Sequence, residues 1–212
     1  MLDEQEFKLR VTRPETFDEI AEAPEITELA AGPARTLEMT ADYIDTEDLR
    51  LEKAGYAYRI RWEGDHWMAT VKADATGSPT EGLHRHREWE TLVPGPAPDL
   101  AVFDDPELRS TLACLQGDRP LITLFRVTME RRIRHLELPG GAQAEWAADR
   151  GRILADDRAD PVWEVELELK DGELRPLRDL IGRLQERYPL VPDNRTKFAR
   201  GLKLAGLEPP RA

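Results

Sequence analysis

The chain has 212 residues, of which 40% are hydrophobic and 34% are charged, a composition typical of a folded globular protein rather than a disordered one. Its length suits one large domain with a substantial core. The formal net charge of −12 argues against general nucleic-acid binding, because a phosphate backbone attracts a basic surface, but it leaves room for a small anion in a local basic pocket.

Alternation of apolar and polar residues dominates the chain and predicts eight β-strands. They lie near residues 3–11, 35–45, 56–63, 66–74, 85–93, 122–136, 143–149 and 162–170. Two connections, WEGDHW at 62–67 and LPGGAQ at 138–143, are short and contain glycine, as tight hairpins do. The pattern therefore predicts an antiparallel sheet of about eight strands, a number that can close into a barrel.

Helical periodicity is confined to four segments. They are PETFDEIAEAPEI at 14–26, PELRSTLACLQ at 106–116, LRPLRDLIGRLQERY at 174–188 and TKFARGLKL at 196–204. The third is the clearest, because its leucines and Ile181 fall on one stripe and Pro189 ends it. Since no change of composition marks a boundary, we expect one α+β domain over residues 1–212, an antiparallel β-barrel with flanking helices.

Charged residues share one face in five of the predicted strands. In an extended chain successive side chains point to opposite faces, so Glu4, Glu6 and Lys8 lie together, with Arg10 beyond them. The other sets are Arg59 and Arg61; Lys72; Glu88 and Glu90; and Glu164, Glu166, Glu168 and Lys170. For one strand alone a solvated face is the simplest interpretation, but the repetition favours charges that point into the lumen of a closed sheet.

Such a lumen has to be wet or filled with compensating ions, because isolated buried charges are prohibitive. Glutamates at positions i and i+2 of two strands form an oxygen cage suited to Mg²⁺ or Mn²⁺. Lysine and arginine of neighbouring strands bind the oxygens of a polyanion. A nucleotide or an inorganic polyphosphate that carries metal ions satisfies both sets.

With these residues in view, nearly the whole chain resembles the CYTH family, the triphosphate tunnel metalloenzymes. The family's N-terminal ExExK pattern is Glu4-Gln5-Glu6-Phe7-Lys8, a weak signal alone. Its companions follow in the expected order: YIDTEDLRLEKAGYAYRIR, WMATVK, GLHRHREWE, AADRG, WEVELELKDG and NRTKFARGLKL. Their details are most similar to bacterial inorganic triphosphatases of the family. The resemblance implies an eight-stranded antiparallel β-tunnel with flanking helices and a triphosphate inside it.

The resemblance also implies roles, position by position. The implied ligands of Mg²⁺ or Mn²⁺ are Glu4, Glu6, Asp149, Glu164 and Glu166. The implied substrate contacts are Lys8, Arg59, Arg61, Lys72, Glu88, Arg131 and Lys197, and the implied catalytic group is Glu4, Glu6, Lys8, Arg59, Arg61 and Lys72. Lys197 lies in the family's C-terminal serine-lysine motif, where Thr196 replaces the serine and keeps a hydroxyl.

The face of Arg131 stays open at this point. Simple alternation puts Arg131 on the side of Val127 and Met129, which are apolar, and Arg132 on the other side. Either a β-bulge shifts the register, or Arg132 is the residue that faces the tunnel.

The favoured function is metal-dependent hydrolysis of inorganic triphosphate to pyrophosphate and phosphate. Thiamine triphosphate, a nucleoside triphosphate, or ATP cyclised to cAMP are alternative substrates, because tunnel residues contact only the phosphates. A non-catalytic module that binds polyphosphate is a further alternative, disfavoured by the glutamate pairs, since binding alone could rely on lysine and arginine. A monomer and a homodimer are both compatible with the sequence.

The remaining features are interpreted as structural. His84 and His86 form an H-x-H pair with no third ligand nearby in sequence, so we expect surface or loop histidines. Cys114, the single cysteine, fits a reducing compartment, and its helical spacing from neighbouring leucines predicts core packing. No apolar run approaches the roughly 20 residues of a membrane span and no signal peptide is evident, so we expect a cytoplasmic protein without a membrane partner.

Overall fold

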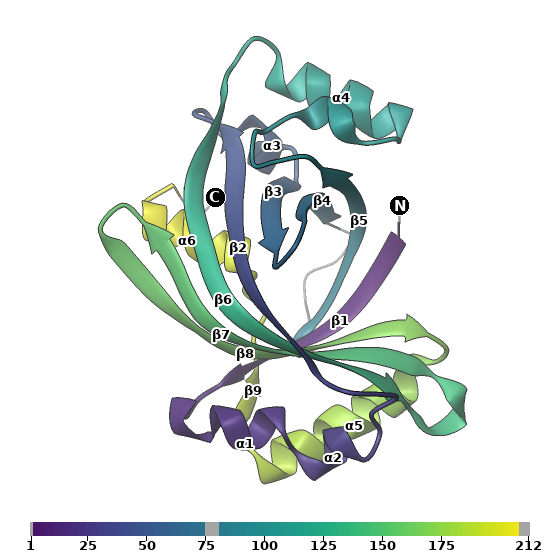
Figure 1. Ribbon diagram of the computed structural model, residues 1–212. Helices are drawn as coiled ribbons and strands as arrows, with labels where there is room; N and C mark the ends of the chain where they lie inside the picture. The colour runs from purple at the N-terminus through teal and green to yellow at the C-terminus, as the bar shows by residue number, and fades with distance from the viewer. Residues whose placement is uncertain (1, 75–80, 208–212) are drawn as a thin grey trace.

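The computed structural model describes residues 2–74 and 81–207, in which eight antiparallel strands close into a barrel (Figure 1). The strands are β1 (Leu2–Val11), β2 (Arg35–Thr46), β3 (Tyr56–Glu63), β4 (Trp67–Asp74), β5 (Leu83–Val93), β6 (Leu121–Glu137), β7 (Gln143–Ala155) and β8 (Arg158–Asp171). They follow the order β5-β4-β3-β2-β6-β7-β8-β1, and β1 also pairs with β5, which closes the ring. The predicted eight-stranded barrel is therefore confirmed. A short strand, β9 (Leu190–Pro192), pairs with β1.

The helices are α1 (Phe17–Ala21), α2 (Pro24–Thr27), α3 (Arg50–Lys53), α4 (Pro106–Gln116), α5 (Leu174–Arg187) and α6 (Lys197–Ala205). Five of these helices lie around the barrel, and α6 packs against its inner face. The helix predicted over 14–26 is instead a 3₁₀ turn followed by α1 and α2. The break falls at Pro24, which has no amide hydrogen to donate and restricts the residue before it.

The β7–β8 hairpin extends further than the predicted strands at 143–149 and 162–170. Its ladder continues to the pair Ala155–Arg158, so that only Asp156 and Asp157 form the turn. Asp156 has a φ of 52°, a left-handed conformation that aspartate tolerates better than most residues. The sequence pattern was too short here because polar residues occupy both faces of the hairpin end.

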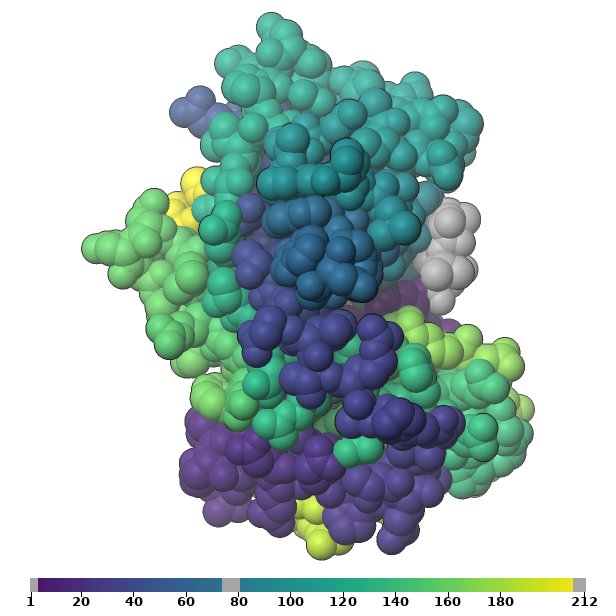
Figure 2. Space-filling model, viewed as in Figure 1, coloured from purple at the N-terminus to yellow at the C-terminus, as the bar shows by residue number. Residues whose placement is uncertain are grey.

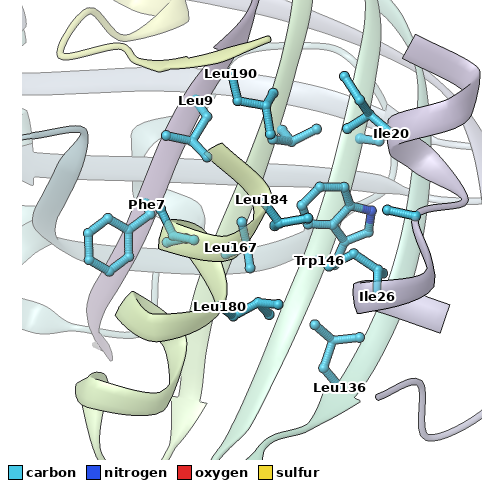
Figure 3. Packing of buried hydrophobic residues seen from close by; sticks show 14 of the residues in the cluster. Phe7, Leu9, Ile20, Ile26, Leu136, Trp146, Leu167, Leu180, Leu184 and Leu190 are labelled. Atoms are coloured by element: carbon cyan, nitrogen blue, oxygen red, sulfur yellow. The ribbon is translucent and has the colours of Figure 1, made fainter. Parts of the chain in front are cut away.

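Two apolar clusters pack on the outside of the barrel. One joins β1, β7 and β8 to α1, α2 and α5; Figure 3 shows Leu180 and Leu184 of α5 beside Leu167 and Trp146. The other joins β3, β4 and β5 to α3 and α4. In the space-filling view α4 and the α1–α2 segment form opposite ends of the molecule (Figure 2). Each fully buried large side chain contributes about 1.5–3 kcal/mol, so these clusters fix which strand face points inward.

The third apolar cluster lies on the inner face, where α6 packs against β6 and β7. It contains Phe125, Val127 and Met129 of β6 together with Leu202 of α6. Packing is so close at Gly201 that a Cβ atom there would lie 2.1 Å from the Phe125 ring. Part of the lumen is thus filled by a helix rather than by solvent.

Cys114 differs from its predicted core position. The helix α4 turns Leu108 and Leu112 toward the strands, and Cys114 is an exposed free thiol. The helical spacing of Cys114 from the leucines predicted a place near the apolar stripe of α4. Only Leu108 and Leu112 of this helix are buried, so Cys114 lies outside the buried face. Among the residues that the structure describes, no helix combines the length and apolarity needed to cross a membrane.

Candidate functional site

The barrel encloses a cavity of about 1270 Å³ whose wall is charged. Every barrel strand and α6 contribute to it. Its lining includes Glu4, Glu6 and Lys8 of β1, Arg59 and Arg61 of β3, Lys72 of β4, His86 and Glu88 of β5, Arg131 of β6, Glu166 and Glu168 of β8, and Lys197 of α6. Asp149 and Glu164 are fully buried behind this wall. Arg10, the last charge of the β1 face, is exposed instead.

Basic side chains of β3 and β4 form one wall of the cavity. Arg59 Nη2 lies 3.7 Å from Glu88 Oε1, and Lys72 Nζ lies 3.3 Å from Glu88 Oε2. Burial opposes the charge of Arg59, yet Tyr43 and Glu88 raise its pKa above the usual value. Burial likewise opposes the charge of Lys72, but Glu4, Glu6 and Glu88 raise its pKa. Both side chains therefore stay cationic and can bind anionic oxygens.

A first acidic cluster consists of Asp149, Glu164 and Glu166, whose ligand atoms lie within 4.8 Å of one another. The cations Lys8, Arg131 and Lys197 fill it; they will be called the resident cations. The contacts are Lys8 Nζ–Glu164 Oε1 at 3.1 Å, Arg131 Nη2–Asp149 Oδ2 at 2.6 Å, Arg131 Nη2–Glu166 Oε2 at 2.5 Å, and Lys197 Nζ to Asp149 Oδ2 and Glu166 Oε1 at 2.8 Å each; Lys197 also pairs with Glu164. Burial tends to raise the pKa of Asp149, but Arg131 and Lys197 bring it below the usual range.

A second cluster consists of Glu4, Glu6 and His86, whose ligand atoms also lie within 4.8 Å of one another. Its register explains the proximity, since Glu4 pairs with His86 across the β1–β5 seam and Glu6 pairs with Glu168 across β1–β8. Lys72 Nζ lies 2.9 Å from Glu4 Oε2. Burial and the charge of Glu4 nevertheless raise the pKa of Glu168 to about 7. Burial is the larger cause, so this carboxyl is held in its protonated form mainly because it is withdrawn from water, and Glu4 adds to the effect.

The five predicted metal ligands therefore fall into two groups. Glu4 and Glu6 belong to the second cluster, and Asp149, Glu164 and Glu166 belong to the first. Oxygen-rich donor sets of this kind fit Mg²⁺ or Mn²⁺. The fit is better at the second cluster, because the resident cations already neutralise the first.

Arg131 lies in the cavity wall, and both alternatives left open by the sequence are wrong. The register shift near this part of β6 falls beside Tyr43 and Ile44, before Phe125, so alternation from Phe125 to Arg131 is unbroken. Arg132 lies outside the barrel, where its Nη2 donates to Asp18 Oδ1 at 2.6 Å. Along β6 the inner face is apolar where α6 covers it and charged further on, at Arg131. The sequence pattern predicted a lumen that is charged throughout, and therefore did not predict this change.

His84 and His86 do not lie on a surface or in a loop. Both belong to β5, on the face of Glu88. His84 is buried, and its Nε2 donates to the Asp193 carbonyl oxygen at 2.9 Å. His86 Nε2 lies 2.5 Å from Glu4 Oε2. Their even spacing from Glu88 was the signal that could have placed them in the wall.

Tyr43 is a further wall residue that sequence reasoning passed over. It lies beside the Arg59 guanidinium and stacks on Phe125 of β6 and Phe198 of α6, with ring centroids 4.7 Å and 5.7 Å away. Burial tends to raise its pKa, but Arg59 and Lys197 bring the pKa below the usual value. Tyr43 therefore joins the basic wall to α6. Tyr43 lies in the YIDT segment, and the sequence predicted no role for its side chain.

The sequence comparisons agree with this architecture. A family model described as CYTH domain matches residues 2–202. An inorganic triphosphatase from Haemophilus influenzae is 28% identical over 164 residues, which amount to 76% of this chain and 44% of that protein. The chain thus spans less than half the length of this relative.

Two solved structures are similar in fold. A candidate adenylyl cyclase from Hippeastrum, described as having a dominant triphosphatase activity, superposes with a TM-score of 0.67 at 17% identity and covers 98% of each chain. A candidate adenylate cyclase from Bacillus halodurans gives a TM-score of 0.59 at 19% identity over 94% of this chain and 98% of the other. At these identities the similarity extends to the fold, and activity has to be argued from the site.

Proposed function

The chain belongs to the CYTH domain family, and on that ground we propose that its cavity hydrolyses inorganic triphosphate to pyrophosphate and phosphate with the help of Mg²⁺ or Mn²⁺. The observation that carries the proposal is the opposition of a basic wall and an acidic cluster inside one cavity of the barrel. A triphosphate with its metal ion matches both. The similarity to the Haemophilus influenzae inorganic triphosphatase supports this substrate over others.

The basic wall would bind the phosphates. Arg59, Arg61 and Lys72 now contact glutamates, and phosphate oxygens are acceptors of the same kind with more charge. Their contribution to rate would come from neutralising the charge that grows on the bridging and leaving oxygens. Because β3 and β4 are fixed by the outer core, the strands that carry these donors need not move when the side chains exchange a glutamate for a phosphate.

The second cluster would hold the metal ion, through Glu4 and Glu6. When bound there, a divalent cation supplies Lewis-acid polarisation of phosphate oxygens and a more acidic water. In the first cluster, Asp149, Glu164 and Glu166 are the proposed ligands of a further cation. They become free for it only when Lys8, Arg131 and Lys197 contact the substrate instead.

The test is a product assay. Purified protein is incubated with Mg²⁺ or Mn²⁺ and, separately, inorganic triphosphate, thiamine triphosphate, ATP and a longer polyphosphate, and phosphate, pyrophosphate and cAMP are measured. We expect phosphate and pyrophosphate from inorganic triphosphate at the highest rate. Tight binding of triphosphate without any product would contradict the proposal and favour a binding module; cAMP as main product would favour a cyclase.

A further inference from the structure

We propose that His86 is a third protein ligand of the cation at Glu4 and Glu6, and that its imidazole makes this site prefer Mn²⁺ over Mg²⁺. The inference rests on the proposed function only in that a divalent cation binds there. His86 belongs to the H-x-H pair with His84, a pattern that can bind a metal ion but has no third ligand nearby in the sequence.

The fold supplies those missing ligands. The β1–β5 pairing that closes the barrel sets Glu4 directly across from His86, and side chains of paired residues point to the same face. His86 Nε2 lies 2.5 Å from Glu4 Oε2, and Glu6 places an oxygen within the same 4.8 Å group. The side chains of His86 and Glu4 are only 11% and 7% exposed, so bulk water competes little for them.

Lys72 shows where a positive charge fits. Its Nζ lies 2.6 Å from His86 Nε2, 2.9 Å from Glu4 Oε2 and 3.3 Å from Glu88 Oε2. Because an ammonium group has donors only and an ionised carboxylate has acceptors only, this nitrogen presents a lone pair to Lys72 when the ring proton is on Nδ1, and donates to Glu4 when the proton is on Nε2. The same lone pair is what an imidazole uses to bind a metal ion. One imidazole nitrogen and the Glu4 carboxylate thus converge on a cation.

The donor set decides which ion binds better. Mg²⁺ binds oxygen ligands and keeps several waters, whereas a nitrogen ligand is better suited to first-row transition ions. The first cluster offers oxygen donors alone, from Asp149, Glu164 and Glu166, and has no histidine among its members. Selectivity for Mn²⁺ over Mg²⁺ should therefore originate at the second cluster.

The experiment uses Mn²⁺ alone, added to the full chain without substrate. Electron spin echo envelope modulation detects a ¹⁴N nucleus bonded to Mn²⁺, and competition with Mg²⁺ gives the ratio of the two affinities. His86→Gln and His86→Asn are compared with His66→Gln, a matched control, because His66 also lines the cavity but lies beside Asp65, outside the cluster.

We expect ¹⁴N modulation in the wild type and in His66→Gln, and its loss in both His86 variants. The preference for Mn²⁺ over Mg²⁺ should fall about tenfold or more on removal of the nitrogen ligand. A wild type without ¹⁴N modulation, or modulation that persists in the folded His86 variants, would overturn the inference.

A parallel product assay separates this inference from the proposed function. Hydrolysis of inorganic triphosphate by a wild type without ¹⁴N modulation would overturn the role of His86 and leave the function standing. The opposite result is also informative. If the modulation depends on His86 but the protein hydrolyses nothing in the substrate panel, His86 is supported as a metal ligand and the proposed hydrolysis is contradicted.

Discussion

The two acidic clusters of the cavity are built from the same residue types and differ in how their charge is balanced. Around Asp149, Glu164 and Glu166, the resident cations Lys8, Arg131 and Lys197 match the three carboxylates in number, and Arg200 Nη1 also lies 3.5 Å from Glu164 Oε2. Around Glu4, Glu6 and His86, Lys72 is shared with Glu88, and the pKa of Glu168 is raised to about 7, first by burial and then by Glu4. The charge of the first cluster is balanced within the substrate-free protein, whereas the second is the cluster at which we propose that a cation binds.

An acidic cluster is therefore not by itself a metal site. Buried ion pairs gain little net stability, but removing one partner leaves an uncompensated charge at high cost. The first cluster should therefore respond to mutation mainly through stability. The second should respond mainly through metal binding and pH.

The largest expected effect is on the first cluster. Lys197→Ala removes a resident cation and should lower the free energy of unfolding by about 3–5 kcal/mol, because Asp149 and Glu164 are fully buried. Urea denaturation measures the change. Lys203→Ala, on an exposed turn of the same helix, is the matched control and should change stability by less than about 0.5 kcal/mol. Equal effects of the two substitutions would contradict the account.

Next comes the basic wall, where the main expected effect is on the rate of hydrolysis. Arg59→Ala removes a donor to the proposed phosphate site and should slow hydrolysis of inorganic triphosphate about 10²–10³-fold. Arg132→Ala is the control, since Arg132 lies outside the barrel against Asp18. Steady-state rates of triphosphate hydrolysis by both variants measure the difference. A near-normal rate for Arg59→Ala would remove Arg59 from the site.

The pH dependence of the second cluster gives a third, smaller effect. Because the pKa of Glu168 is raised from 4.5 to about 7, folding favours its protonated form. Glu168 therefore costs no stability below pH 4.5, and its cost grows as the pH rises to 7 and is complete above it. At 1.36 kcal/mol per pKa unit, reduced for partial exposure, the full cost is about 2–3 kcal/mol.

Glu168→Gln should remove this cost. The variant should be more stable than the wild type at pH 8 by about 2–3 kcal/mol, and similar to it at pH 4, as chemical denaturation at the two pH values would report. Glu137→Gln, an exposed position on β6, serves as control and should change stability little at either pH. If Glu168→Gln stabilised the protein equally at pH 4 and pH 8, the raised pKa of Glu168 would not be the cause of the gain.

The smallest effect concerns the helix that carries Lys197. Thr196 is the N-cap of α6, and its Oγ1 accepts a hydrogen bond from the Ala199 amide at 3.0 Å. Thr196→Ala should cost about 1 kcal/mol, whereas Thr196→Ser keeps the cap and should cost only a few tenths. Thermal unfolding of the two variants checks the difference. A loss as large with serine as with alanine would show that the methyl group, not the cap, matters.

Much of this architecture was predictable from the sequence. Alternation located the barrel strands, and the charged faces of β1, β3 and β8 followed from the same period, since outer apolar clusters fix the orientation of each strand. What the sequence could not give was the pairing between distant strands. His86 was missed because its partner Glu4 is 82 positions away in the chain.

The inner apolar cluster was missed for a related reason. A period-2 pattern says which side chains share a face, and it does not say what that face contacts along its length. In β6 the face passes from Phe125 under α6 to Arg131 among acids. The division of the predicted metal ligands into two clusters likewise depends on where Lys197 and Arg131 lie, which only the folded chain determines.

The most direct test is a calorimetric titration of Mn²⁺ into substrate-free protein, with Glu6→Gln and Glu166→Gln measured beside the wild type. We expect one bound ion per chain in the wild type and in Glu166→Gln, and no bound ion in Glu6→Gln. Retention of that ion in Glu6→Gln together with its loss in Glu166→Gln would mean that the neutralised cluster, not the open one, is the metal site.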